Sequence, residues 1–217
     1  MWLFRERLTE TGKDKEVWEE LQRQLDAKGY DVKKGVIQDA SVITADPGQK
    51  NRKRKKGGGG GGGGARTRRS RDGTWLTHGK KSWFGYKLHV KTDVDHGLVR
   101  ALETTTASVH DNQVDLSEKG EVRYSDKGYY GAPCRGFDAG MRRGVRGHPL
   151  GIRDKLMNKR IARKRSPGER PFAVIKGPFR SGHVLVTTVA RTGVKMLFAC
   201  FGFNVSQLRT LAGKEGV

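Results

Sequence analysis

Hydrophobic side chains recur every three or four residues in residues 14–28, where Trp18, Leu21 and Leu25 fall on one helical face. The segment ends at Gly29, a residue type that commonly terminates helices. The upstream sequence WLFRERL has the same character and looks like a second helix that is cut short at its beginning. We therefore expect residues 1–30 to be the helical remnant of a larger N-terminal region.

The middle of the chain alternates between apolar and other positions, which is typical of strands. Residues 34–46 are rich in β-branched side chains and predict a first strand. Residues 82–108 predict two strands joined by the turn DVDHG, and residues 120–131 predict a shorter strand that ends in a Gly-rich turn. Within residues 82–108, the apolar set is Phe84, Tyr86, Leu88 and Val90, and the alternating set is Trp83, Gly85, Lys87, His89 and Lys91.

The last third of the chain reads as mainly helical. Residues 150–180 have helical character, with Pro167 near a helix start, where proline is tolerated. From Val194 onward apolar residues recur every three or four positions, which predicts a buried helix. Two adjacent strands followed by strands separated by helices favour an α/β domain with a mixed sheet over residues 31–217.

A glycine-rich basic segment interrupts this pattern. Residues 48–73 lack apolar periodicity and contain eight consecutive glycines between basic clusters. Such a chain is flexible, and its like charges keep it extended. Phosphate-binding loops need specific glycines between a strand and a helix, a pattern that an uninterrupted run lacks. The sequence predicts a disordered insertion, a flexible basic loop over residues 48–81.

Charge narrows the classes of partner. The 217-residue chain has a formal net charge of +21 and a sequence pI near 10.3, which favours a polyanion, and nucleic acid is the commonest one. The longest apolar run, residues 196–205, is too short to cross a bilayer, so we expect no membrane partner. Cys134 and Cys200 lack metal-site spacing and are expected to be thiols in a reducing cytoplasm.

Three acidic residues are candidates for metal-dependent chemistry. Asp39 and Asp126 lie at the ends of strand-like segments, and Glu169 lies at a helix start inside the basic stretch RKRSPGERPFAVIKG. Carboxylates at strand ends commonly hold hard divalent cations, and two bridged metals can drive phosphodiester displacement. The three residues are far apart in the sequence, and their spacing fits surface or capping acids equally well.

Four blocks of the sequence resemble DDE transposases encoded by insertion sequences. In chain order they are VIQDASVITADPG, WFGYKLHVKTDVDHGLVRALETTTASVHD, YSDKGYYG and SPGERPFAVIKGPF. The chain is most similar to the insertion-sequence-five-like group of archaea and bacteria, from residue 1 to about residue 211, apart from the glycine tract. The resemblance implies a ribonuclease-H-like mixed sheet flanked by helices. It also implies two Mg²⁺ ions, with Mn²⁺ as a substitute, held by Asp39, Asp126 and Glu169 as catalytic residues.

The same family carries the signature Tyr-x-x-Arg-x-x-x-Glu-x-x-x-x-x-x-Lys, which Arg165, Glu169 and Lys176 match. Ala162 stands at the tyrosine position, so a hydroxyl is missing there or supplied elsewhere. We expect Arg165 and Lys176 to contact DNA phosphates, with solvated surface charge as the alternative. The other expected DNA-binding cations are Lys159, Arg160, Arg163 and Lys164.

Several polar and aromatic residues near these blocks admit two interpretations. His110 is either a catalytic group or part of a strand-to-helix turn capped by Asp111. Trp75 and Trp83 either stack on bases or lie at a sheet edge. The tyrosines expected to pack beside the metal site are Tyr129 and Tyr130, and the acids expected in turns or caps are Asp46, Asp93, Asp95 and Asp115.

The resemblance implies a cytoplasmic, nucleoid-associated polynucleotidyl transferase. It would cleave double-stranded DNA at the terminal inverted repeats of a transposon and join the freed 3′-hydroxyl to target DNA, and a homodimer is one arrangement it allows. Residues 1–30 resemble only the last helices of the family's N-terminal region, so we expect a truncated chain. Two alternatives stay open: a nuclease on the same fold, and a non-enzymatic basic DNA-binding remnant.

Overall fold

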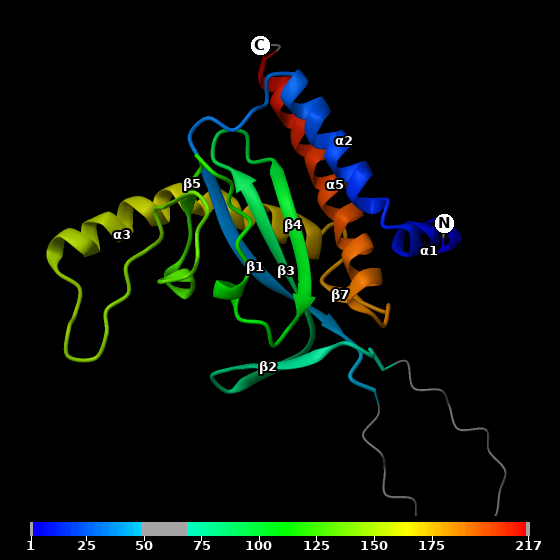
Figure 1. The fold of residues 1–217 in the computed structure, drawn as a ribbon, viewed down its shortest axis with the longest axis horizontal. Coiled ribbons are helices and arrows are strands. Elements are labelled where there is room, and N and C mark those ends of the chain that lie inside the picture. Colours follow the sequence, from blue (N-terminus) through cyan, green and yellow to red (C-terminus); the bar gives the residue numbers. More distant parts are fainter. Residues whose placement is uncertain (1, 49–68, 216–217) are drawn as a thin grey trace, which may run out of the picture.

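The computed structural model describes residues 2–48 and 69–215 (Figure 1). The strands are β1 (Val36–Ala45), β2 (Thr74–His78), β3 (Lys81–Asp93), β4 (Val99–Thr106), β5 (Val122–Tyr124), β6 (Phe137–Asp138) and β7 (His183–Val184). The helices are α1 (Trp2–Thr11), α2 (Asp14–Ala27), α3 (Ile152–Arg165), α4 (Glu169–Lys176) and α5 (Val189–Glu215), with the 3₁₀ turns η1 (Asp111–Gln113), η2 (Lys127–Tyr129) and η3 (Ser166–Gly168).

The described strands form one mixed sheet. Its order is β2-β3-β1-β5-β6, with β4 also paired to β3 and β7 also paired to β1. β1 is antiparallel to β3 and parallel to β5 and β7. Helices flank the sheet, and Figure 1 shows α2 and α5 running side by side along it. The mixed α/β class predicted from the sequence is confirmed.

The alternation in β3 separates a buried apolar face from a polar one. Phe84, Tyr86, Leu88 and Val90 belong to the main hydrophobic core, together with apolar side chains of α2, α4 and α5. β1 and β3 approach closely at Gly85, where a Cβ atom would lie 2.3 Å from the carbonyl oxygen of Ile43. Only glycine fits there, and its φ of +149° is one that other residues rarely adopt.

The helices at the start of the chain pack on the same core. Trp18, Leu21 and Leu25 of α2 are buried in it, and the indole nitrogen of Trp18 donates a hydrogen bond to the carbonyl oxygen of Arg100, at 3.2 Å. In α1, Glu6 forms an ion pair with Arg191 of α5, at 2.6 Å. These helices therefore cover one face of the sheet rather than standing apart from it.

Most predicted elements appear close to the expected positions. The helix expected over residues 14–28 is α2, the strand over 34–46 is β1, and the buried helix at the end of the chain is α5. Residues 150–180 form α3 and α4, with Pro167 in the short turn η3 between them. None of the described helices is long and apolar enough to span a lipid bilayer.

The predicted loop over residues 48–81 is wrong at its C-terminal end. Residues 74–78 form β2, which pairs with β3 through a hairpin whose turn is at Gly79 and Lys80. The segment was missed because TWLTH is short and adjoins the glycine-rich tract. Residues 49–68, which include all eight consecutive glycines, lie outside the described residues.

Candidate active site

The sheet has an opening beside β1. On the edge of β1 opposite β3, β5 pairs only at Val36 and Ile37, and β7 pairs only at Thr44 and Ala45. Within the described residues, no strand covers this edge between Ile37 and Thr44. Side chains of the residues that follow the last β1–β5 pair, Ile37 and Tyr124, can therefore reach into this opening.

Asp39 and Asp126 lie at the same level of this opening. Ile37 pairs with Tyr124, and each aspartate comes two residues later on its own segment. Since β1 and β5 are parallel, equal offsets from a pair place the two residues side by side. The Asp39 Oδ1 atom accepts a hydrogen bond from Ala40 N at 2.9 Å, and the Asp126 Oδ1 atom accepts one from Gly128 N at 2.8 Å.

The charges of the two carboxylates act on each other. Burial raises the pKa of the Asp39 carboxyl group, and the negative charges of Asp126 and Asp111 raise it further. The guanidinium group of Arg165 opposes this shift through an ion pair of 3.1 Å between Arg165 Nη2 and Asp39 Oδ2. The carboxylate of Asp39 is thus a half-buried charge that a nearby cation stabilises.

Both cations of the family signature, one on α3 and one on α4, contact β1. Arg165 contacts Asp39, and the ammonium group of Lys176 donates a hydrogen bond to Ser41 Oγ at 2.7 Å. Asp39 and Ser41 are two residues apart on a strand and share one face. Burial lowers the pKa of Lys176. Arg165 and Lys176 therefore line the opening, although their contacts in this structure are with β1.

Glu169 stands at the start of α4 and outside the aspartate pair. The preceding residue, Gly168, packs so closely on Ile37 that a Cβ atom would lie 2.6 Å from Ile37 Cγ2, which holds the start of α4 against β1. The Glu169 side chain is nevertheless exposed. Among residues 2–48 and 69–215, no group of three His, Cys, Asp or Glu side chains is arranged to hold a metal ion. Two of the three predicted acids are brought together, and the third is not.

The aspartate pair is chemically suited to a hard divalent cation. Carboxylate oxygens are the ligands that Mg²⁺ takes in proteins, and one or two carboxylates suffice because waters and substrate phosphates complete its octahedron. Burial is the main cause of the raised pKa of Asp39, with the charges of Asp126 and Asp111 adding to it, and Arg165 forms an ion pair with the same carboxylate. The residues present therefore fit the group that the sequence suggested.

An ion pair, which the sequence analysis did not assign to the site, and a buried tyrosine lie beside the two aspartates. The ammonium group of Lys87 on β3 lies 2.8 Å from Asp111 Oδ1 and donates to the carbonyl oxygen of Val109 at 2.6 Å. Tyr129 is almost fully buried, and burial together with the charges of Asp111, Asp39 and Asp126 raises its pKa. The available signal was the pair of basic side chains, Lys87 and His89, in a central strand.

His89 is expected to make stability depend on pH. Burial lowers its pKa from the ordinary value of 6.5 to about 4, so the folded state keeps it neutral while the unfolded chain takes up a proton. The free energy of unfolding should fall by about 2 kcal/mol between pH 7 and pH 5 through this residue alone. Urea unfolding at both pH values should show that His89→Gln flattens this slope, whereas His78→Gln on the exposed hairpin does not. Equal slopes in all three proteins would contradict the assignment.

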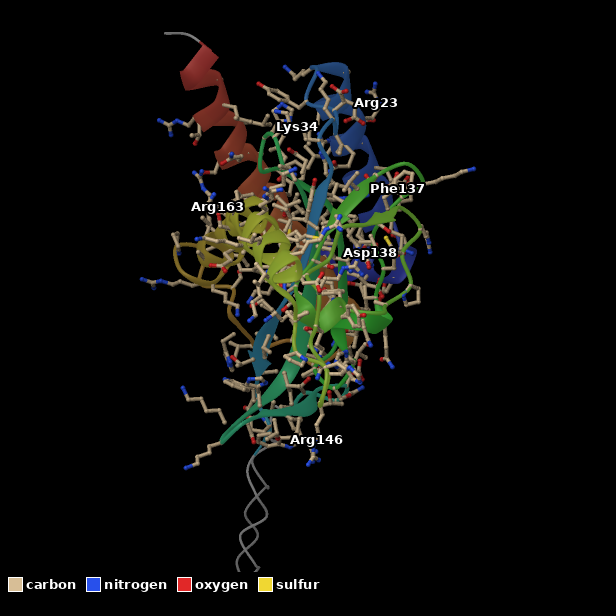
Figure 2. All side chains as sticks on the ribbon, turned by 90° about the vertical axis from the view of Figure 1, so that its left-hand side faces the viewer. Arg23, Lys34, Phe137, Asp138, Arg146 and Arg163 are labelled. Carbon is tan, nitrogen blue, oxygen red and sulfur yellow. The ribbon has the colours of Figure 1, made fainter. Side chains whose placement is uncertain are left out.

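The remaining predicted DNA-binding cations lie along α3. Lys159, Arg160 and Arg163 are exposed, and Figure 2, which views the molecule from the side of α3, shows Arg163 on its surface. Lys164 is held instead by Tyr124, because its ammonium group donates to the tyrosine hydroxyl at 2.9 Å and lies 4.8 Å from the ring centroid. Among these four described cations, Lys164 is the one whose side chain bonds to β5.

The other candidates of the sequence analysis have structural roles. His110, rather than Asp111, caps η1 by accepting a hydrogen bond from Asn112 N at 3.3 Å. Trp75 is exposed and its ring lies 5.4 Å from that of Phe84. The acids expected in turns accept backbone N–H groups, as predicted: Asp46 from Gly48, Asp93 from His96 and Leu98, Asp95 from Lys34, and Asp115 from Ser117 and Arg135. Cys134 and Cys200 are free thiols.

A curled mixed sheet flanked by helices, with one acidic side chain inside β1 and another just after the adjacent parallel strand β5, is consistent with a ribonuclease-H-like domain. The family described as transposase DDE domain matches residues 30–205, and the chain belongs to this family. Membership implies a DNA-binding enzyme of the polynucleotidyl-transferase type, in a family that generally uses divalent metals. No solved structure matches the chain.

Proposed function

We propose that the chain is the transposase of an insertion sequence of the insertion-sequence-five-like group, which cleaves phosphodiesters at the ends of its element and joins them to target DNA. The observation that carries this proposal is the side-by-side placement of Asp39 and Asp126 at the opening beside β1. The family match supports the reaction class. The basic character of the chain supports a polyanionic substrate.

In this mechanism Asp39 and Asp126 would hold Mg²⁺ or Mn²⁺. Glu169, which is exposed at the first turn of α4 and outside the aspartate pair, would have to move toward them to act as the third acid. When bound, such a cation would act as a Lewis acid that lowers the pKa of a water and offsets negative charge on the phosphate. Arg165 forms an ion pair with Asp39, and it would also contact a phosphate of the bound DNA strand. Lys176, which is half-buried and donates to Ser41, would bind the same DNA strand further along β1.

The exposed cations of α3 extend this contact to flanking DNA. Lys159, Arg160 and Arg163 would bind backbone phosphates without reading sequence. Each phosphate neutralised releases counterions, so affinity should fall steeply as salt rises. The double-stranded substrate would thus lie over α3 and enter the opening at Arg165.

Cleavage of duplex DNA that carries the ends of the element tests the proposal. We expect cutting with Mg²⁺ or Mn²⁺ and none with EDTA. Glu169→Gln should lower the rate by about 10²-fold, since a metal site contributes several kcal/mol to the barrier. Glu103→Gln, at an exposed acid of β4, is the matched control and should leave the rate unchanged. Equal rates for the two variants would remove Glu169 from the mechanism.

The same assay separates the alternatives. A nuclease on this fold would cut but fail to join precut ends with a free 3′-hydroxyl to a target plasmid. A basic DNA-binding remnant would bind in a salt-sensitive manner and show no metal-dependent cutting at all. Joined products that depend on the metal support the transposase.

A further inference from the structure

A cavity of about 530 Å³ lies between α1, α5 and the turn after α4, away from the opening beside β1. Three aromatic rings line it: Phe4 of α1, Phe198 of α5, and Phe179 of the turn. The rings of Phe4 and Phe198 are 6.2 Å apart and tilted by 48°. Phe4 is 54% exposed and Phe179 is 38% exposed, so their faces are open to a ligand.

The polar lining of this cavity is cationic. Arg5 and Lys195 line it, and none of the lining side chains that the structure describes is acidic. Burial lowers the pKa of Lys195, and the positive charge of Arg5 lowers it further, so the two cations repel each other across a partly dry space. Lys195 donates only a long hydrogen bond, 3.3 Å, to the carbonyl oxygen of His183. An anionic ligand would relieve this repulsion.

One wall of the cavity has no side chain, because it is formed by a glycine inside α5. Glycine is unfavourable in a helix interior, and a Cβ atom at Gly202 would meet the ring of Phe179 at 3.5 Å, an ordinary contact. An alanine would therefore fit and favour the helix. A longer side chain would extend into the cavity, which Gly202 also lines.

We propose that this aromatic cavity binds an unpaired nucleotide of single-stranded DNA, with the base between the phenylalanine rings and the phosphate on Arg5 and Lys195. Aromatic rings beside cations are how proteins bind single strands without sequence preference. The cavity is connected to the candidate site through α4, because Phe179 follows this helix and its N–H donates to the carbonyl oxygen of Val174, at 3.1 Å. The inference deepens the proposed function by adding a site for DNA that is not base-paired.

Fluorescence anisotropy with two labelled oligonucleotides of equal length tests this site, using the full chain in EDTA at physiological salt. One probe is oligothymidylate, and the other has the same phosphates but abasic sugars. Wild type should bind oligothymidylate about tenfold more tightly than the abasic probe, since stacking one base contributes a gain of this order. Phe179→Ala and Phe4→Ala should remove the preference. Phe137→Ala, at a ring that is 69% exposed on β6, should keep it.

Gly202→Leu fills the cavity from a position in the middle of a helix, and leucine favours helices, so circular dichroism should show an intact fold. It should also abolish the preference. Equal affinity of wild type for both probes, or an equal loss in Phe137→Ala, would overturn the proposal. An acidic peptide without aromatic residues is a further competitor. If it displaces oligothymidylate from wild type but not from Gly202→Leu, the proposal is also overturned. Because no metal is present, this result is independent of whether the chain cleaves DNA.

Discussion

Asp39→Asn is expected to lower metal-dependent DNA cleavage by about 10³-fold or more while duplex DNA binding stays near the wild-type level. The substitution keeps the size of the side chain and an oxygen that can accept a hydrogen bond from Arg165, and it removes the charge that would hold a divalent cation. A loss of about 4 kcal/mol of transition-state stabilisation corresponds to this factor. Single-turnover cleavage and anisotropy with the same duplex measure the two effects separately.

The same variant should not lose stability. Burial makes the largest contribution to the raised pKa of Asp39, so the ionised carboxylate destabilises the metal-free fold at neutral pH. Removing the charge should leave the free energy of unfolding equal or higher, as expected where function and stability conflict. Asp46→Asn, just beyond the end of β1, is the matched control and should keep full cleavage. A cleaving Asp39→Asn protein would exclude this residue from the reaction.

Arg123→Met is expected to have the largest effect on stability, a decrease of about 3–5 kcal/mol in the free energy of unfolding. The guanidinium group is fully buried and forms ion pairs with Asp115 at 3.2 Å and Asp138 at 3.3 Å. It also donates to the carbonyl oxygen of Pro133 at 2.9 Å and lies 5.9 Å from the ring centroid of Tyr129. Its loss leaves uncompensated acids beside β5, the strand that positions Asp126.

Urea unfolding followed by circular dichroism measures this change. Arg23→Met is the comparison, because Arg23 also pairs with a carboxylate, Glu20 at 2.7 Å, but on an exposed helix face. Because solvent screens a pair on an exposed helix face, Arg23→Met should change the free energy of unfolding very little. Similar losses in the two variants would show that burial of the Arg123 network contributes nothing to the fold.

The sequence predicted the elements that have strong periodicity. α2 and α5 follow apolar spacings of three and four residues, and β3 follows strict alternation, because each buries one face against the core. β6 and β7 were missed, since each contains two residues and their pairing is set by neighbouring strands rather than by local pattern. β2 was assigned to a loop for the same reason.

The candidate site could be predicted only in part. Both aspartates were predicted at strand ends, which is right for Asp126 after β5 and wrong for Asp39, because β1 continues to Ala45. Their alignment depends on a β1–β5 register of two residue pairs that no sequence pattern encodes. The family motif placed Arg165 and Lys176 near the acids without indicating that they contact Asp39 and Ser41. Asp111 and Lys87 meet across a turn and a strand, a contact that only the fold creates.

The central claim, that Asp39 and Asp126 together bind a divalent cation, is tested most directly by calorimetric titration of the DNA-free protein with Mn²⁺. Wild type should bind Mn²⁺ and gain thermal stability as the concentration rises, because ligand binding to the folded state stabilises it. The Asp39→Asn, Asp126→Asn double variant should show neither effect. If the double variant binds as many Mn²⁺ ions as wild type with the same affinity, the two aspartates are not the metal site.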